Sequence, residues 1–134
     1  MRKLLLVSCW LLAVGCWQGC SSDPAPEELA AKAALSYYNR LLEGYPDGLT
    51  AAKAGADDLP SDYRAQLGKV YEQYVRDINL KHGGLRAVAV SDNVGRRDSV
   101  SGVVYAFLML SFADSTQEEI VVPMVERNGA WYLR

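Results

Sequence analysis

Cysteine thiols are the most reactive side chains in this chain of 134 residues, and all three lie within its first 20 residues. A secreted domain that is held together by disulfides carries an even number of cysteines inside its folded part. Here the chain after residue 20 contains none, so Cys9, Cys16 and Cys20 indicate processing of the chain rather than cross-linking of a domain.

The residues around these cysteines have the order of a bacterial export signal. Arg2 and Lys3 form a positively charged start, and an almost wholly apolar run follows over residues 4–14. This run is shorter than the roughly 20 apolar residues that a transmembrane helix needs. The sequence therefore predicts a cleaved signal peptide, with a buried N-terminal helix as the weaker alternative.

Two of the cysteines are candidates for lipidation. Residues 12–16 (LAVGC) resemble the bacterial lipobox, in which small and apolar residues precede the cysteine that receives diacylglycerol. Residues 17–20 (WQGC) are the second candidate, although Trp and Gln fit the motif poorly. We expect a signal peptide within residues 1–19, cleaved before Cys16 or Cys20 with Cys16 preferred, and a tether over residues 20–26. Several acyl chains anchor a protein stably to a membrane without spanning it.

The residue after the acylated cysteine bears on the destination of the protein. It is Trp17 or Ser21 here, and neither is the aspartate that retains lipoproteins in the inner membrane in well-studied Gram-negative sorting. The sequence therefore predicts an exported protein that is lipid-anchored to the cell envelope, in the outer membrane.

The remaining chain has the composition of one small acidic domain. From residue 21 onward it has 12 Lys and Arg residues and 16 Asp and Glu residues, a formal net charge of −4. Arg96 and Arg97 form its one basic pair, beside Asp98 in an expected hairpin loop, where a solvated turn is the simplest interpretation. We expect no nucleic-acid partner, because such a partner usually requires a basic stripe.

Acid–base and metal chemistry have few candidates in this domain. The single histidine, His82, stands beside two glycines at the expected end of a helix, which favours a structural role. One histidine and no cysteine suit neither a zinc site nor a cysteine–histidine nucleophile. Glu118 and Glu119 are neighbours on an expected strand and point to opposite faces, so they cannot form a dyad. We expect no metal, no cofactor and no catalytic residue, with a lone pocket glutamate, Glu119 or Glu126, as the open alternative.

Helical periodicity marks the first half of the domain. The spacing predicts helices over residues 26–43 and 61–82, with a short helix within residues 46–55 and a loop over residues 57–60. Ser61 is the expected N-cap of the long helix. This helix carries one apolar stripe, expected to pack on a sheet: Tyr63, Leu67, Val70, Tyr71, Tyr74, Val75 and Ile78.

After Gly84 the apolar period changes to two. This pattern predicts strands over residues 85–90, 99–112, 116–126 and 130–133. Asn128 and Gly129 form a strong signal for a two-residue hairpin turn. Helices followed by an antiparallel meander make an α+β domain.

Both faces of the two central strands are apolar. On the first strand, the residues that point one way are Val103, Tyr105, Phe107 and Met109, and those that point the other way are Val104, Ala106, Leu108, Leu110 and Phe112. The next strand repeats this alternation, with Ile120, Val122 and Met124 on one side and Val121, Pro123 and Val125 on the other. A sheet with one face in water normally alternates apolar and polar residues. Helices cover one face, so a second copy, a curled sheet or a partner must cover the other. A homodimer through this second face is the preferred explanation.

Three features together resemble a known family. They are residues 31–44 (AKAALSYYNRLLEG), the apolar strand pair, and residues 125–134 (VERNGAWYLR). They resemble small bacterial lipoproteins whose nuclear-transport-factor-2-like domain, a cystatin-like cone, has no assigned function. The resemblance covers residues 27–134 and implies N-terminal helices packed on a curved four-stranded antiparallel sheet that leaves a pocket. Proteins of this fold include isomerases, dehydratases and many without activity, so the fold does not settle the function.

Aromatic side chains are the candidates for lining such a pocket. Tyrosine joins an apolar body to a polar tip, so Tyr38, Tyr74, Tyr105 and Trp131 are predicted as pocket-lining, with core packing as the simpler alternative. We expect a membrane-anchored envelope lipoprotein whose domain binds a small ligand or a protein without catalysis. The alternative is a small isomerase- or dehydratase-type enzyme that uses a pocket carboxylate and a tyrosine.

Overall fold

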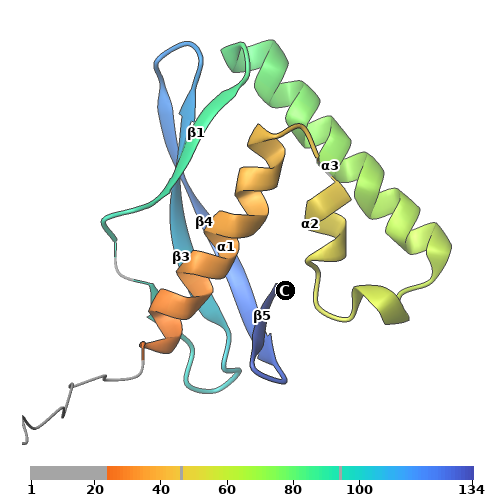
Figure 1. Ribbon diagram of the computed structural model, residues 1–134, viewed down its shortest axis with the longest axis vertical. Helices are drawn as coiled ribbons and strands as arrows, with labels where there is room; N and C mark the ends of the chain where they lie inside the picture. Colours follow the sequence, from red (N-terminus) through yellow and green to blue (C-terminus); the bar gives the residue numbers. More distant parts are fainter. Residues whose placement is uncertain (1–23, 46, 94) are drawn as a thin grey trace, which may run out of the picture.

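The computed structural model describes residues 24–134 except residues 46 and 94 (Figure 1). Its elements, in chain order, are α1 (Pro26–Leu42), α2 (Asp47–Ala51), the 3-10 turn η1 (Ala56–Asp58), α3 (Ser61–His82), β1 (Leu85–Val90), β2 (Arg96–Arg97), β3 (Val104–Phe112), β4 (Gln117–Arg127) and β5 (Ala130–Leu133). The expected export signal, with Cys9, Cys16 and Cys20, lies outside the described residues.

Helix α1 begins and ends close to where the sequence predicts. Pro26 occupies the first helical position, where its missing amide hydrogen costs nothing, and acidic side chains lie near the positive end of the helix dipole. The helix ends at Leu42, and Gly44 follows in the left-handed conformation with φ +85°. Its buried residues are mostly alanines, namely Ala30, Ala31 and Ala34 together with Leu41. These small side chains let the helix lie close to the sheet.

The segment between α1 and α3 departs from the predictions. The short helix is α2, which spans only Asp47–Ala51 of the residues predicted for it. Asp57 and Asp58, which the sequence placed in a loop, belong to η1. Ser61 is the first residue of α3 rather than its cap, because Pro60 holds that position and the Ser61 hydroxyl donates to the side chain of Asp62.

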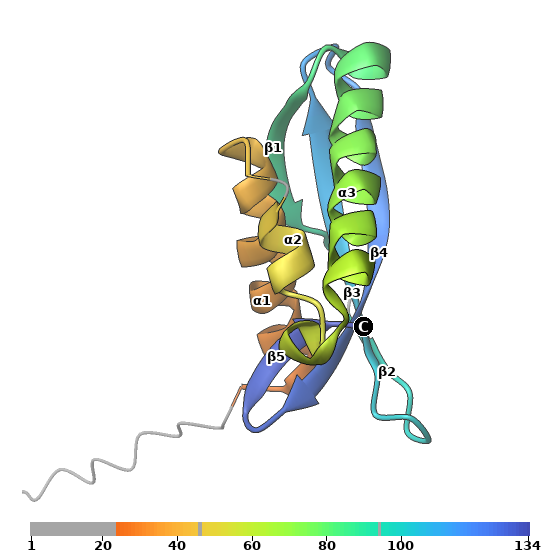
Figure 2. The same ribbon diagram turned by 90° about the vertical axis from the view of Figure 1, so that its right-hand side faces the viewer.

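The packing predicted for the long helix α3 is wrong for its first half. α3 packs mainly on α2 and meets β1 only near its end (Figure 2). Ile78 is buried and Tyr74 is half-buried against the core, whereas Tyr63 and Val70 are 44% and 61% exposed. The physical reason is that α1 already occupies the face of the sheet, so the first turns of α3 find only α2 beside them.

The strands form one antiparallel sheet in the order β1-β3-β4-β5, which confirms the predicted meander. Asn128 and Gly129 have φ values of +54° and +81°, as a two-residue hairpin between β4 and β5 requires. The strand predicted from residue 99 begins only at Val104. Arg96 and Arg97, predicted in a loop, form the short strand β2 on β3, and residues 98–102 make the loop between the two strands.

The hydrophobic core lies between α1 and one face of the sheet. Burial alternates residue by residue along β3, which confirms the predicted parity: Val104, Ala106, Leu108, Leu110 and Phe112 are buried, and the residues between them are half-exposed. Both clusters of buried apolar residues draw their members from residues 30–133. Residues 24–134 therefore contain both of these core clusters, and we expect this part of the chain to fold as a unit.

Candidate functional site

The face of the sheet turned away from α1 carries no helix in the described part of the chain (Figure 2). Its centre is formed by two paired strands, with Tyr105 opposite Pro123 and Phe107 opposite Val121. Val121 is 52% exposed. We call this surface the outer face; its members on the three strands are Tyr105, Phe107, Met109, Val121, Pro123, Val125 and Tyr132.

Charged residues stand at the two ends of the outer face. Glu119 is paired with Met109 near one end, and Arg96 is paired with Tyr105 at the other. The Glu119 carboxylate accepts hydrogen bonds from the Ser91 hydroxyl and, at 2.6 Å, from the side-chain amide nitrogen Nδ2 of Asn93. Glu119 is exposed and therefore belongs to the rim of this face rather than to an enclosed pocket.

Three tyrosines come together between α1 and α3. Tyr38, Tyr71 and Tyr74 all pack, half-buried, against the core. Burial raises the pKa of all three phenols, most strongly for Tyr38, whose pKa the neighbouring phenols of Tyr74 and Tyr71 raise further. These hydroxyls stay protonated at neutral pH, so they can donate a hydrogen bond but cannot act as a general base.

The four aromatic residues predicted to line a pocket occupy different places. Tyr38 and Tyr74 lie together between the two long helices, and Trp131 is 9% exposed within the main core cluster. Tyr105 lies on the outer face, because successive residues of a strand point to opposite sides and Val104 faces α1. The structure therefore brings only two of the four together, and ligand contact by any of them stays a prediction.

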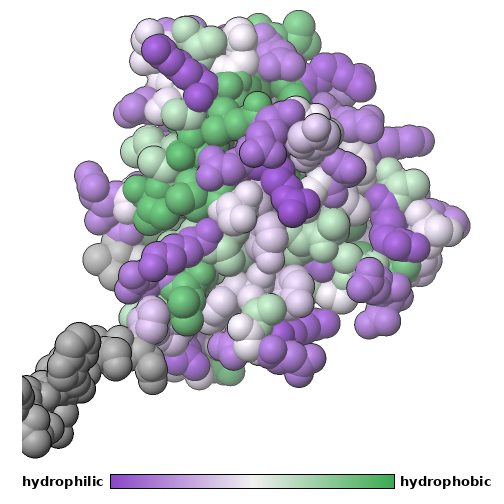
Figure 3. Space-filling model, viewed as in Figure 1, coloured by the Kyte–Doolittle hydropathy of each residue, from purple (hydrophilic) through white to green (hydrophobic). Residues whose placement is uncertain are grey.

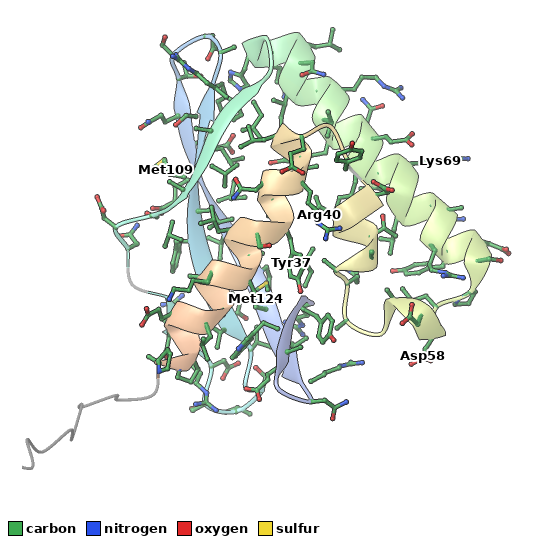
Figure 4. All side chains as sticks on the ribbon, viewed as in Figure 1. Tyr37, Arg40, Asp58, Lys69, Met109 and Met124 are labelled. Carbon is green, nitrogen blue, oxygen red and sulfur yellow. The ribbon has the colours of Figure 1, made fainter. Side chains whose placement is uncertain are left out.

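Tyr37 is a positioning residue that sequence reasoning missed. Its hydroxyl donates a 2.6 Å hydrogen bond to the backbone carbonyl of Trp131, and thereby ties α1 to β5 (Figure 4). Burial raises the pKa of this phenol, and the nearby phenol of Tyr132 raises it to a smaller extent. The available signal was the Tyr37-Tyr38 pair, because adjacent helical residues point about 100° apart and so reach different neighbours.

His82 belongs to a cluster that joins the end of α3 to the turn between β3 and β4. Its Nδ1 lies 2.8 Å from Oδ2 of Asp114 and 3.2 Å from Oγ1 of Thr116. Its ring stacks on Phe112 with ring centres 4.1 Å apart, and the Asp114 amide donates to the His82 carbonyl at 3.1 Å. These contacts hold the helix end in place, in keeping with the structural role predicted for His82.

We expect acid to weaken this cluster through Asp114. Hydrogen bonds from Thr116 and His82 lower the pKa of Asp114 from 3.8 to about 2. Because this folded-state pKa lies below the unfolded one, its stabilisation is present above about pH 4 and is lost as the pH falls toward 2. The urea concentration at the midpoint of unfolding should fall less between about pH 5 and about pH 2.5 for Asp114→Asn than for the unchanged protein. An equal fall in both proteins would contradict the assignment of this acid sensitivity to Asp114.

Several hollows mark the surface of the described residues. One of about 580 Å³ lies between the start of α1 and the end of β1, with Ala31 and Val90 among its lining residues. Apolar side chains gather beside α1 and β1 on this side of the molecule (Figure 3). A hollow of about 400 Å³ separates α2 and η1 from α3, and the nearby Thr50 hydroxyl is buried without a partner. Neither hollow is lined by the predicted aromatic residues.

The described ranges, 24–45, 47–93 and 95–134, offer neither a metal site nor a membrane-spanning helix. No group of three or more His, Cys, Asp or Glu side chains there is placed to hold a metal ion. No helix in these ranges is both long enough and apolar enough to cross a membrane.

Comparison with known proteins identifies the fold. No protein-family model and no curated protein sequence matches the chain. A crystal structure of a Campylobacter jejuni protein, provisionally named an NTF2-like transpeptidase, superposes with a TM-score of 0.57 over 76% of this chain and 94% of that chain, at 8% identity. At this identity the similarity shows the fold alone. The domain has the nuclear-transport-factor-2-like (NTF2-like) α+β fold, with helices packed on a curled antiparallel sheet, which confirms the predicted fold class.

Proposed function

We propose that this protein is an exported, lipid-anchored component of a bacterial envelope whose NTF2-like domain binds a partner without catalysis. The partner that we propose is a second copy of the chain, seated on the outer face. The observation that carries this proposal is an apolar sheet face that no helix covers within residues 24–134. Large apolar patches on the surface of a domain usually mark protein contacts.

A two-fold dimer would bury the apolar centre of the outer face. A two-fold axis near the Phe107–Val121 pair reverses the strand direction of the second copy. The apolar centre of one copy then packs against the same apolar centre of the other. An apolar centre surrounded by a polar rim is the usual arrangement of a specific interface.

The dimer predicts a large effect of a single charge at its centre. Val121→Glu would place two carboxylates close to the axis, where they repel each other and lose water, so residues 24–134 with this change should sediment as a monomer. The matched control is Val70→Glu on α3, because Val70 is also exposed and apolar but lies away from the outer face. We expect sedimentation equilibrium to show dimers for the unchanged domain and for Val70→Glu. A monomeric unchanged domain would overturn the dimer.

The chemistry of the described side chains supports binding without catalysis. The interior phenols of Tyr38 and Tyr74 have raised pKa values and remain protonated. The pKa values of Asp98 and Asp114 are lowered, whereas a general acid needs a raised pKa. Glu119 and Glu126, the candidate pocket acids, are both exposed to solvent.

The lipid anchor is supported by the sequence alone. The charged start, the short apolar run and the two candidate motifs at Cys16 and Cys20 precede the described residues, and α1 begins directly after the expected tether. Anchoring in the outer membrane follows from the residue after either cysteine. Such an anchor would hold the domain at a membrane surface and raise its local concentration there, which favours a weak dimer.

A further inference from the structure

The end of the domain nearest the tether carries a second distinctive surface. The first turn of α1, the β4–β5 turn, and β2 with its loop to β3 all lie at this end (Figure 2). We propose that the loop of residues 98–102, with Arg96 and Arg97 beside it, contacts the anionic lipid headgroups of the membrane that holds the protein. This inference rests on the proposed lipid anchor.

The loop presents an apolar side chain to solvent. Val100 at its tip is 94% exposed. The loop is braced by Asp98, whose carboxylate accepts hydrogen bonds from the Val100 amide at 2.9 Å and from the Ser101 hydroxyl at 2.8 Å. The Gly102 amide also donates to the Asp98 carbonyl at 2.8 Å, with Gly102 at φ +73°. An apolar tip on a braced loop is suited to enter the boundary between headgroups and acyl chains.

The charges around the loop are complementary to anionic lipid. Arg96 and Arg97 are exposed, and neither forms an ion pair with another described residue. The Asp98 carboxylate is occupied by groups of its own loop, and Glu28 on α1 is paired with Lys32 at 3.2 Å. Free basic side chains close to a negatively charged leaflet are attracted to it.

The length of the tether selects this end of the domain. Pro24 lies four positions after Cys20 and eight positions after Cys16, so an extended tether reaches at most about 14 Å or about 29 Å. The opposite end, with the β3–β4 turn and the end of α3, lies at the far side of the domain along its long axis (Figure 1). A tether of this length therefore favours this end of the domain, which includes the loop of residues 98–102, as the side that faces the bilayer.

Vesicle binding by residues 24–134 tests the contact without the anchor, because this part contains both core clusters. We expect it to cosediment with vesicles of equal parts phosphatidylglycerol and phosphatidylcholine more strongly than with phosphatidylcholine alone. Changing Arg96 and Arg97 together to glutamine should weaken the partition by about five-fold for each arginine. Val100→Ser should weaken it further without changing the charge.

The matched control removes the same charge elsewhere. Arg64→Gln with Lys69→Gln, both exposed on α3, should leave vesicle binding unchanged. No preference for phosphatidylglycerol, or equal losses in the loop and control variants, would overturn the proposal. The lipid anchor is tested by a separate measurement, the acylation of the full chain. If the full chain is not acylated but residues 24–134 still bind vesicles, the anchor is disproved and the surface contact is not.

Discussion

Replacing Leu108 by alanine is expected to lower the free energy of unfolding of the domain by about 2–5 kcal/mol. Leu108 is fully buried on β3, on the face that packs against α1. The change removes apolar atoms from the core and leaves a cavity. The paired strands on either side and the closely packed α1 can close that cavity only in part. Urea unfolding of residues 24–134, followed by far-ultraviolet circular dichroism, measures the loss.

A leucine of the same domain provides the control. Leu80 lies on α3 and is 80% exposed, so Leu80→Ala should change the free energy of unfolding by no more than about 0.5 kcal/mol. A similar loss for both variants would mean that the core does not lie between α1 and β3.

Changing Cys16 to serine in the full chain is expected to abolish acylation and to release the protein from the membrane fraction. The lipid is carried on a thioether, which a serine hydroxyl does not form. Without acyl chains the mature chain has no anchor comparable to them, since each buried methylene contributes about 0.8 kcal/mol to membrane binding. Labelling of growing cells with a fatty-acid analogue, followed by fractionation, measures both effects.

The two other cysteines serve as matched controls. The Cys9→Ser and Cys20→Ser variants should keep both the label and the membrane location. Mass spectrometry should show that the mature N-terminal peptide begins at Cys16. Loss of label only in Cys20→Ser would move the anchor to Cys20. Label retained in all three variants would contradict the assignment of the lipid to Cys16 alone, and label absent from the unchanged protein would contradict the lipid anchor.

Local signals account for the elements that the sequence predicted well. Pro26 and Gly44 bracket α1, because proline is tolerated only in the first turn and glycine adopts the left-handed conformation after the last. Asn128 and Gly129 specify the hairpin before β5 for the same backbone reason. β1 and β5 have the predicted ends, since each is a short run bounded by turn residues.

Tertiary contacts account for the elements that the sequence predicted poorly. Arg96 and Arg97 have no strand-like pattern of their own and become β2 only because the edge of β3 lies beside them. The stripe on α3 has helical spacing, yet Val70 and Tyr63 stay exposed because no element covers them. The spacing of apolar residues predicts which side chains share a face of a helix, but it does not predict which element packs against that face.

Some features of the candidate site can be predicted from the sequence, and others depend on the tertiary structure. By itself the sequence predicted that the cysteines belong to export and that one histidine and scattered carboxylates make a poor catalytic set, and it showed that β3 and β4 are apolar on both faces. It could not choose which apolar face is the core, because the side chains of a strand alternate and both alternating sets are large and apolar. The tertiary structure decided this: the alanines of α1, Ala30 and Ala34, lie against the Val104–Leu108 side, and Tyr105 and Val121 remain on the outer face.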